Sequence, residues 1–428
     1  MLKVQIESLG CKVNSVEAES VAELFKAKGH KIVKRGADVV VINTCCVTME
    51  AESKSRQAIR KALKNGAMVA VMGCASQLSP NELRDIGVSV IVGTADRKSI
   101  VEKVEYAIKN PKPEKTAFDK VFGEKEADIE LELPTEYEEL PHIPSKTRAF
   151  VKIQDGCNGQ CTYCVIPKVR GKARSRSLES IVEESKNLKE YKEIVLTGIN
   201  LGIYGLDIGL TLVDAIKAVL DNTTARIRLS SIEPNEVTDD LIDLIRDEPR
   251  ICKYLHIPIQ SGCDAILEMM HRPYKTADIV ELINKLKSEI PSIAIGTDII
   301  NGFPGESIPM YTQSMNFVQS LPINYFHIFG YSPRKGTLAA EMTQVSPNNK
   351  KIRVNKMLAL AAHKNVQFRQ SRIGSDVEVL TETFKSGYTE GHSDDYIKVY
   401  VEGEIPLNEI IKIKLIDVFK DGMIGTVI

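Results

Sequence analysis

The first hundred residues alternate short apolar segments with longer helix-like stretches such as Val16–Lys28 and Ser53–Lys64. The apolar segments are rich in Val and Ile, and turn or polar residues follow each of them. They are KVQIESLG (3–10), ADVVVINT (37–44), AMVAVMG (67–73) and VSVIVG (88–93). This alternation predicts an α/β domain with a flavodoxin-like parallel sheet and helices on both faces.

The alternation restarts near Arg148 and continues through six further strand candidates. They are AFVKIQ (149–154), EIVLTGI (193–199), RIRLSSI (226–232), YLHIPI (254–259), IAIGTDII (293–300) and YFHIFGYS (325–332). Helical stretches such as Leu178–Lys189 and Tyr274–Ser288 separate them, and Asn349–Gln370 closes the series. Six strand–helix repeats predict a (β/α)6 partial TIM barrel.

The pattern changes again from about residue 371, where short strands follow one another without helices. VEVLTET, YIKVYVE, EIIKIKLIDVF and MIGTVI predict a small all-β barrel. Residues 111–146 are rich in Pro, Glu and Lys and are typical of a linker. We therefore predict a first domain at 1–110, a linker at 111–146, a barrel domain at 147–370 and a β-barrel at 371–428.

The composition of the chain indicates the cellular compartment in which we expect the protein. The chain has 428 residues, 43% of them hydrophobic, and a formal net charge of −1, so no global positive field announces a nucleic-acid partner. The N-terminal residues show no signal peptide, and no apolar run approaches the roughly 18 residues of a membrane helix. We expect a cytoplasmic protein without a membrane partner, whose nine cysteines serve as ligands more readily than as disulfides.

Three of those cysteines, Cys157, Cys161 and Cys164, have the spacing Cys-x3-Cys-x2-Cys. Three thiols can hold three irons of a [4Fe–4S] cluster and leave the fourth iron open for a ligand. The loop follows the first barrel strand, at the end where barrel enzymes place their chemistry. The alternatives are a zinc site, which would normally want a fourth protein ligand nearby, and a redox Cys-x-x-Cys.

The loop resembles the signature of radical S-adenosylmethionine (SAM) enzymes, including the aromatic Tyr163 before the third cysteine. Glu193–Asn200 and Asn301–Glu306 are similar to family segments that contact SAM. The resemblance implies that SAM binds the open iron and yields a 5′-deoxyadenosyl radical on reduction. Residues at the carboxyl ends of the central strands are then candidates for SAM binding. They are Tyr163, Thr197, Gly198, Asn200, Ser231, Glu233, Gln260 and Asp298, and each polar one could equally be a loop cap or a turn former.

A second set of cysteines, Cys11, Cys45 and Cys74, follows three strands of the predicted parallel sheet. All three would lie at the carboxyl edge, where open α/β sheets bind ligands. They could hold a second open cluster, or they could be ordinary buried cysteines.

The segments Gly10–Asn14, Asn43–Cys45 and Gly73–Cys74 resemble the three cysteine motifs of radical-SAM methylthiotransferases. These enzymes combine a cluster domain, a radical SAM domain and a TRAM domain, and the resemblance covers essentially the whole chain. It implies two [4Fe–4S] clusters, one that generates the radical with SAM and one that carries the sulfur, together with an electron donor and a sulfur source. The family alignment favours Cys45 over Cys46 as a ligand, and we interpret Cys46, Cys252 and Cys263 as structural.

The prediction of a substrate depends on the motif Gly10-Cys11-Lys12-Val13-Asn14. This form resembles the MtaB group, which modifies C2 of N6-threonylcarbamoyladenosine at position 37 in the tRNA anticodon loop. The alternatives are a methylthiotransferase that acts on a ribosomal protein and a non-catalytic iron–sulfur protein with closed clusters.

Candidate substrate contacts come from a basic run beside the cysteine loop. Arg170, Arg174 and Arg176 belong to it, and Arg334 lies further along the chain. They could bind phosphates or the threonylcarbamoyl carboxylate, or the run could be a solvated loop. No catalytic residue is identified by this reasoning. Residues 371–428 hold 6 Lys and Arg against 11 Asp and Glu, which puts an RNA-binding role for that barrel in doubt.

Overall fold

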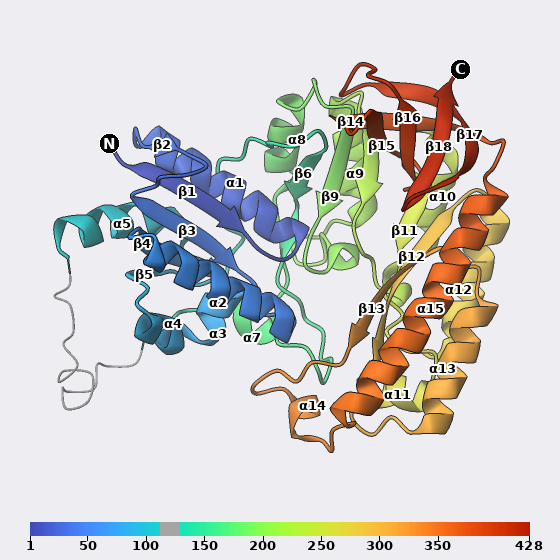
Figure 1. Ribbon diagram of the computed structural model, residues 1–428, viewed down its shortest axis with the longest axis horizontal. Coiled ribbons are helices and arrows are strands. Elements are labelled where there is room, and N and C mark those ends of the chain that lie inside the picture. The colour runs from blue at the N-terminus through green and yellow to red at the C-terminus, as the bar shows by residue number, and fades with distance from the viewer. Residues whose placement is uncertain (112–128) are drawn as a thin grey trace. The chain divides into compact units, whose positions relative to one another are not determined.

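The computed structural model describes residues 1–111 and 129–428, and the chain forms two compact units (Figure 1). The N-terminal unit comprises Met1–Ser145, Asp155–Gly159 and Cys164–Arg174. The C-terminal unit comprises Lys146–Gln154, Gln160–Tyr163 and Ser175–Ile428. Two flanks of the cysteine loop therefore fold with the N-terminal unit, although the following barrel sequence belongs to the other.

A five-stranded parallel sheet forms the centre of the N-terminal unit. Its strands are β1 (Lys3–Ser8), β2 (Lys31–Ile32), β3 (Val39–Thr44), β4 (Met68–Gly73) and β5 (Val90–Ile91). The order β2-β1-β3-β4-β5 is that of a flavodoxin-like doubly wound sheet. The strand order places the carboxyl ends of β1, β3 and β4, the strands that the predicted cysteines follow, side by side.

Helices cover both faces of this sheet because its central strands are apolar on both sides. Buried residues of α1 (Lys12–Ala27) and α5 (Ile100–Lys109) pack on one face. Those of α2 (Met49–Lys64) and α4 (Pro80–Ile86) pack on the other. The helix α3 (Cys74–Leu78) and the 3₁₀ helix η1 (Arg97–Ser99) complete this part of the chain.

The predicted linker is described only in part, since residues 112–128 lie outside the described residues. Residues 129–145 have no helix or strand and run along the N-terminal unit. The side-chain amide of Gln77 donates to the carbonyl of Leu131 (2.8 Å), and His142 hydrogen-bonds Glu19 (3.0 Å). These contacts fix the second half of the predicted linker to the sheet domain.

Six parallel strands of the C-terminal unit follow the chain order expected of a partial barrel. They are β6 (Ala149–Lys152), β9 (Glu193–Thr197), β10 (Arg226–Leu229), β11 (Tyr254–His256), β12 (Ala294–Asn301) and β13 (Tyr325–Gly330). Two three-stranded sheets, β10-β9-β6 and β11-β12-β13, are joined by a bridge between Ile227 and Ile251. The strands are all parallel, with β6 and β13 at the two ends of the series.

Helices alternate with these strands and supply the outer layer of the barrel (Figure 1). They are α8 (Leu178–Lys186), α9 (Leu212–Asn222), α10 (Asp239–Asp247), α12 (Thr276–Glu289), α13 (Ile308–Ser320) and α15 (Pro347–Ser371). Four short helices stand between a strand and the long helix that follows it: η2 (Leu201–Ile203), η3 (Pro234–Glu236), α11 (Asp264–Met269) and α14 (Leu338–Glu341). The short elements β7 (Gln154–Asp155), α7 (Ile166–Arg170) and β8 (Arg174–Ser175) occur where the chain passes between the units.

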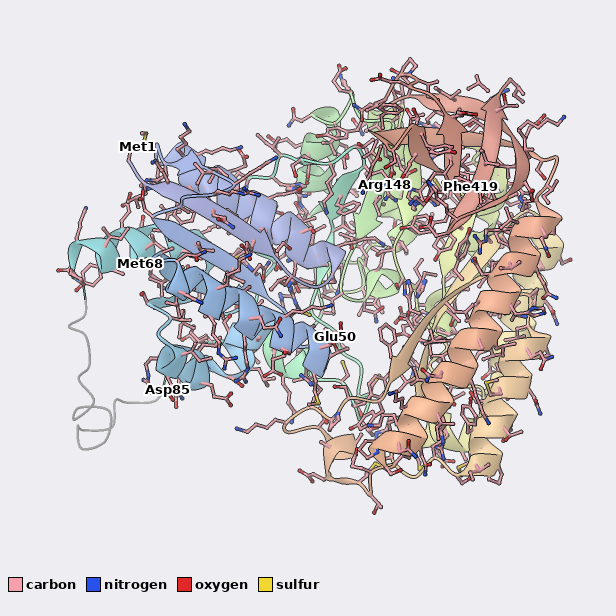
Figure 2. All side chains as sticks on the ribbon, viewed as in Figure 1. Met1, Glu50, Met68, Asp85, Arg148 and Phe419 are labelled. Carbon is pink, nitrogen blue, oxygen red and sulfur yellow. The ribbon has the colours of Figure 1, made fainter. Side chains whose placement is uncertain are left out.

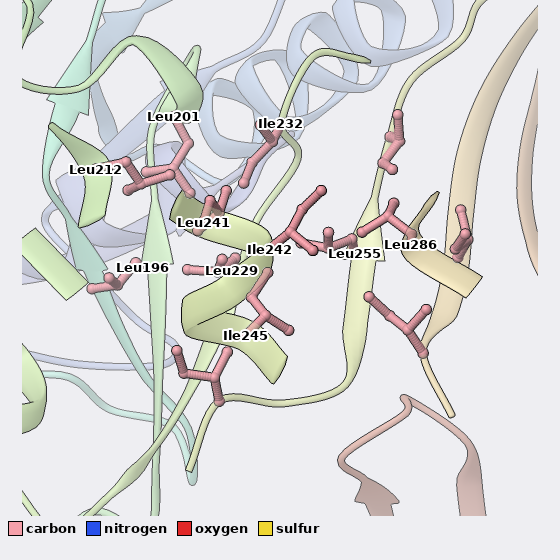
Figure 3. Packing of buried hydrophobic residues seen from close by; sticks show 14 of the residues in the cluster. Leu196, Leu201, Leu212, Leu229, Ile232, Leu241, Ile242, Ile245, Leu255 and Leu286 are labelled. Atoms are coloured by element: carbon pink, nitrogen blue, oxygen red, sulfur yellow. The ribbon is translucent and has the colours of Figure 1, made fainter. Parts of the chain in front are cut away.

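Alternate residues of each barrel strand face two different environments. Leu196, Leu229, Leu255 and Ile299 pack against the helices in one large core, part of which Figure 3 shows from close by. The residues between them point to the inner face of the barrel, and many of these are polar or aromatic. The inner face therefore offers the side chains from which a site can be built.

A closed β-barrel ends the chain. Its strands are β14 (Asp376–Lys385), β15 (Tyr388–Ser393), β16 (Lys398–Glu402), β17 (Ile410–Phe419) and β18 (Gly422–Val427). The predicted tail strands are present, and β15 is an addition that the sequence analysis missed. Its buried positions are Thr389, Gly391 and Ser393, so it lacks the apolar alternation that identifies a strand.

The terminal β-barrel contacts the partial barrel through one aromatic residue and two arginines. Tyr396 has a φ of +71° and stacks on Tyr254, with ring centroids 4.9 Å apart, while the guanidinium of Arg228 lies 4.8 Å from its ring. Arg226 and Arg228 donate to the backbone carbonyls of His392, Ser393 and Asp394. Polar and aromatic contacts therefore join the two barrels.

The observed architecture confirms the predicted fold class: an α/β chain with a flavodoxin-like sheet, a (β/α)6 partial barrel and a strand-rich C-terminal barrel. Within residues 1–111 and 129–428, no helix combines the length and the apolar character needed to cross a bilayer.

Candidate functional site

The thiols of Cys11, Cys45 and Cys74 follow β1, β3 and β4 at the carboxyl edge of the N-terminal sheet. Each of the three interacts electrostatically with another of the set, and Cys45 interacts with both partners. Close approach requires glycine at two positions. A Cβ on Gly10 would lie 2.8 Å from Sγ of Cys45, and one on Gly73 would lie 2.7 Å from the carbonyl of Thr44. The fold thus brings together the three cysteines that the sequence placed at this edge.

Side-chain hydrogen bonds join the three cysteine-bearing loops. The amide of Asn14, which is buried, donates to the carbonyls of Leu9 (2.7 Å) and Thr44 (3.1 Å) and so connects the loops of Cys11 and Cys45. The hydroxyl of Thr44 donates to the carbonyl of Met72 (2.7 Å) and accepts from the N–H of Ser76 (3.1 Å). These bonds fix the thiols before any ligand binds.

Arg170 lies completely buried beside Cys74, and every one of its five N–H groups has a partner. Its Nε donates to Sγ of Cys74 (3.2 Å). Nη1 donates to Glu17 (2.8 Å) and Asp155 (2.9 Å), and Nη2 donates to Asn14 (2.9 Å) and Glu17 (3.1 Å). Since Arg170 comes six residues after Cys164, it ties the flank of the cysteine loop to the N-terminal thiols within one unit.

Two thiols of the N-terminal set differ in acidity. A hydrogen bond from the Cys46 thiol, helped by the charge of Arg170, outweighs burial and lowers the pKa of Cys74 to about 6. Burial raises the pKa of Cys45 to about 11. Cys46 is itself completely buried and packs with Val165 and Val169 as well as with Cys74. Cys46 therefore lies next to one thiol of the set, whereas Cys45 interacts with both of the others.

The thiols of Cys157, Cys161 and Cys164 all accept hydrogen bonds. The backbone N–H of Gly159 donates to Sγ of Cys157 (3.2 Å), and that of Ile166 donates to Sγ of Cys164 (3.4 Å). In the C-terminal unit, Nη1 of Arg272 donates to Sγ of Cys161 (3.1 Å). Donors of this kind favour the thiolate form that binds metals.

Arg272 has a nearly buried side chain that also joins two polar neighbours. Its Nε donates to the hydroxyl of Tyr274 (2.8 Å), and its Nη2 donates to the carboxylate of Glu233. The half-buried ring of Tyr163 meets Phe303 edge to face, with centroids 6.3 Å apart. A guanidinium and a carboxylate thus stand beside the thiol of Cys161.

The candidates for SAM binding on β9 lie at its carboxyl end. Thr197 is buried, and the N–H of Asn200 donates to the side-chain oxygen of Gln154 (2.8 Å). Gly198 approaches Gln154 so closely that a Cβ there would lie 2.9 Å from its side chain. The side-chain amide of Asn200 donates to Glu236 (2.8 Å). These contacts hold the loop after β9 against the end of β6.

The remaining candidates follow β10 and β11 or lie within β12. Ser231 is exposed, and Glu233 is bound to Arg272. Gln260 has a φ of +63°, and its N–H donates to the carbonyl of Asp298 (2.9 Å). The carboxylate of Asp298 accepts hydrogen bonds from His256 (2.9 Å) and His327 (3.0 Å). Ser231, Glu233 and Gln260 thus follow their strands, whereas Asp298 lies inside β12, where it is engaged by two histidines that the sequence analysis did not single out.

Comparison with known proteins decides the family. Residues 151–318 match the radical SAM superfamily, and residues 3–93 match the uncharacterized protein family UPF0004. The threonylcarbamoyladenosine tRNA methylthiotransferase MtaB of Bacillus subtilis is 37% identical, covering 97% of this chain and 94% of its own length. The chain belongs to the radical SAM methylthiotransferases. It is therefore an enzyme of a superfamily that works with SAM and a [4Fe–4S] cluster.

Other members of the family extend this similarity. MtaB of Thermotoga maritima is 35% identical, covering 93% of this chain and 91% of its own. The ribosomal protein uS12 methylthiotransferase RimO of Pelobacter propionicus is 35% identical, with coverage of 91% and 86%. Among solved structures, the radical SAM methyltransferase TsrM of Kitasatospora setae superposes with a TM-score of 0.53 at 12% identity, over 91% of this chain and 80% of that one. That likeness concerns the fold.

The four arginines predicted to contact substrate are all buried. Arg174 donates to the carbonyls of Arg170 (2.8 Å) and Lys172 (2.6 Å), and Arg176 binds Glu184. Arg334 donates to the hydroxyl of Ser332 (3.1 Å). Burial argues against the alternative of a solvated loop, and protein carbonyls, hydroxyls and carboxylates engage the guanidinium groups. The role of these arginines in substrate binding stays a prediction.

Sequence reasoning missed Arg272 as well as Glu17 and Asp155, the carboxylates that hold Arg170. Arg272 lies 111 residues from the thiol that it contacts, and Glu17 lies 153 residues from Arg170. An isolated Arg or Glu in a helix or loop carries no signal of a partner so distant. Asn14 was included in a quoted motif, and its four side-chain hydrogen bonds explain why an amide is needed there.

Proposed function

We propose that this methylthiotransferase adds a methylthio group to C2 of N6-threonylcarbamoyladenosine at position 37 of a cytoplasmic tRNA. The MtaB relatives are threonylcarbamoyladenosine tRNA methylthiotransferases, and their similarity to this chain supports this substrate. The observation that carries the proposal is the second thiol set, which a simple radical SAM enzyme would not need. An electron donor and a sulfur source act from outside the chain.

The N-terminal thiols fit an iron–sulfur cluster. The three sulfurs interact with one another, the glycine at position 10 leaves room for the sulfur of Cys45, and Arg170 supplies a hydrogen bond to one sulfur. Cys11, Cys45 and Cys74 would hold this cluster, and Cys157, Cys161 and Cys164 would hold the other. When bound, the two clusters and SAM supply the radical and the sulfur that the reaction requires. The protein supplies the fixed thiols and the positioning of SAM and substrate.

Polar residues at the carboxyl edge of the barrel are suited to SAM. Its methionine part carries a carboxylate and an amino group, and the pair of Arg272 and Glu233 beside Cys161 offers a charge of each sign. The Arg272 side chain is only 4% exposed, which strengthens such contacts because water competes less for them. Thr197, Gly198, Asn200, Ser231 and Gln260 remain our candidates for the rest of the cofactor.

The terminal β-barrel offers a surface suited to RNA despite its acidic balance. The ammonium of Lys420 lies over the rings of Tyr388 (4.5 Å), Phe419 (4.8 Å) and Tyr400 (5.0 Å). Phe384 is exposed on the same barrel, and Figure 2 marks Phe419. Aromatic rings with a cation among them are the groups on which single-stranded bases stack. This patch supports a TRAM-like role in contacting the anticodon loop.

A direct assay tests the function. The protein is reconstituted anaerobically and incubated with SAM, dithionite and tRNA that carries threonylcarbamoyladenosine, and the nucleosides are analysed by mass spectrometry. We expect the 2-methylthio derivative. A parallel reaction contains ribosomal protein uS12 in place of tRNA, because a RimO relative is also similar to this chain. Methylthiolation of the protein without any modified nucleoside would refute the tRNA proposal.

The assignment of Cys45 rather than Cys46 gives a second prediction. Cys45→Ala should reduce the iron content of the reconstituted protein from about eight to about four atoms per chain, because one cluster loses a ligand. Cys46→Ala should leave the iron content at about eight atoms per chain, since Cys46 packs against Val165 and Val169. Iron is measured by colorimetric assay after desalting. A large loss in Cys46→Ala with none in Cys45→Ala would reverse the assignment.

A further inference from the structure

The inner face of the partial barrel carries a cluster of three polar side chains from neighbouring strands. His256 ends β11, Asp298 lies in β12 and His327 lies in β13. The register pairs Asp298 directly with His327. The residues beside them along the strands, Leu255, Ile299 and Ile328, pack in the core against the helices, so the three polar residues face the opposite way.

Hydrogen bonds fix the protonation pattern of this cluster. Oδ1 of Asp298 lies 2.9 Å from Nε2 of His256 and 3.0 Å from Nδ1 of His327. Burial alone would favour the neutral acid, but the bonds from both histidines outweigh it and hold the pKa of Asp298 below its usual range. An ionised carboxylate only accepts, so both of these ring nitrogens carry protons.

The two histidines have different surroundings. Nδ1 of His256 pairs with the hydroxyl of Tyr254 (3.1 Å), and the His256 side chain is 8% exposed. The side chain of His327 is 64% exposed, and its ring stacks on that of His256 with centroids 4.9 Å apart. Among the described residues, none hydrogen-bonds Nε2 of His327. The ring of His327 is therefore held in place while its Nε2 can form a hydrogen bond with a ligand.

The chemistry of that nitrogen indicates what it binds. With Nδ1 protonated toward Asp298, Nε2 accepts a hydrogen bond in the neutral ring and donates one in the imidazolium. An imidazolium N–H makes a charge-assisted hydrogen bond to a carboxylate. The titratable groups in contact with His327 are Asp298 and His256, and Tyr254 lies beyond His256.

We propose that His327 binds the carboxylate of the threonylcarbamoyl group, and that Asp298 and His256 are positioning residues that orient its ring. This inference rests on the proposed function and assigns the recognition of one substrate group within it. It also gives the enzyme a means to distinguish a carboxylate-bearing adenosine from adenosines with neutral substituents.

The test compares two tRNAs, one with the free threonylcarbamoyl carboxylate and one in which that carboxylate is converted to the methylamide. Equilibrium affinity, measured with reconstituted protein without reductant, and kcat/KM for methylthio product are determined for both. Wild type should prefer the free carboxylate roughly ten-fold or more, the value of a charged hydrogen bond. His327→Ala should lose that preference, because it weakens the binding of the carboxylate-bearing tRNA alone. Asp298→Asn should make the preference smaller.

His363→Ala is the matched control, because His363 is exposed on the outer helix α15 and should keep the wild-type preference. The inference is overturned if His327→Ala weakens the binding of both tRNAs equally or the binding of neither. It is also overturned if the protein with intact clusters binds one Zn²⁺ per chain that His327→Ala abolishes, since the three ligand atoms lie within 4.8 Å of one another. Absence of product from wild type on either tRNA would instead refute the proposed function.

Discussion

Replacement of Arg170 with methionine should destabilise the cluster-free protein by up to about 3–5 kcal/mol, because it removes a fully buried cation that two buried carboxylates share, although Glu17 keeps its ion pair with Arg97 (2.9 Å). Glu17 and Asp155 both accept from Nη1 of Arg170, and the substitution removes that cation while filling a similar volume. Cys74 would lose its N–H donor as well. We therefore expect a lower unfolding midpoint in denaturant and less iron per chain after reconstitution.

Two further variants sharpen this experiment. Arg170→Lys keeps the charge but cannot supply five directed donors, so its loss should be smaller than that of methionine. Lys172→Met alters an exposed cation in the same segment and should leave the unfolding midpoint and the iron content unchanged. Equal stability of Arg170→Met and wild type would show that the buried network is not needed for folding.

Glu193→Gln should have an effect of similar size in the C-terminal unit. The carboxylate is completely buried and accepts from Nε of Arg226 (2.7 Å) and from Nε of Arg228 (2.8 Å). Neutral glutamine would leave two buried guanidinium groups without a counter-charge, at a cost of about 3–5 kcal/mol. Circular dichroism during denaturant unfolding measures this loss.

Acid should weaken the same interaction. Burial opposes ionisation, but Arg228 and Arg226 dominate and lower the pKa of Glu193 to about 2. A depressed pKa contributes stability that is present above the ordinary pKa of about 4.5 and is lost as the pH falls toward about 2. Glu193→Gln should therefore reduce the dependence of stability on pH in that window. Asp247→Asn breaks an exposed pair with Arg246 and should change neither quantity measurably.

The sequence predicted the fold well because strand–helix alternation is a local property. Cys11, Cys45 and Cys74 could be placed at one edge since each follows a strand of a parallel sheet. The strand β15 was not predicted because its inward positions are small or polar. Gly391 shows the reason, since a Cβ there would lie 2.1 Å from the carbonyl of Leu380.

The charges were harder to interpret than the apolar pattern. Arg170, Arg174 and Arg176 form a dense basic run, and such a run is usually taken as a surface for anions. Their partners Glu17, Asp155 and Glu184 come from other parts of the chain, and only the fold shows that they meet. His327 is the opposite case. The sequence shows it only as a residue in a strand, and the register with Asp298 shows that the two side chains lie on the same face of the sheet.

Tyr396 has a consequence for the modular character of this chain. Its ring stacks on Tyr254, and the guanidinium of Arg228 lies over it, so the terminal β-barrel covers two buried side chains of the partial barrel. A version shortened after residue 370 would expose both side chains to water and would lose the carbonyls that accept from Arg226 and Arg228. The last strands are thus part of the structural support of the partial barrel, and we expect their removal to lower the stability of that barrel as well as to remove a surface.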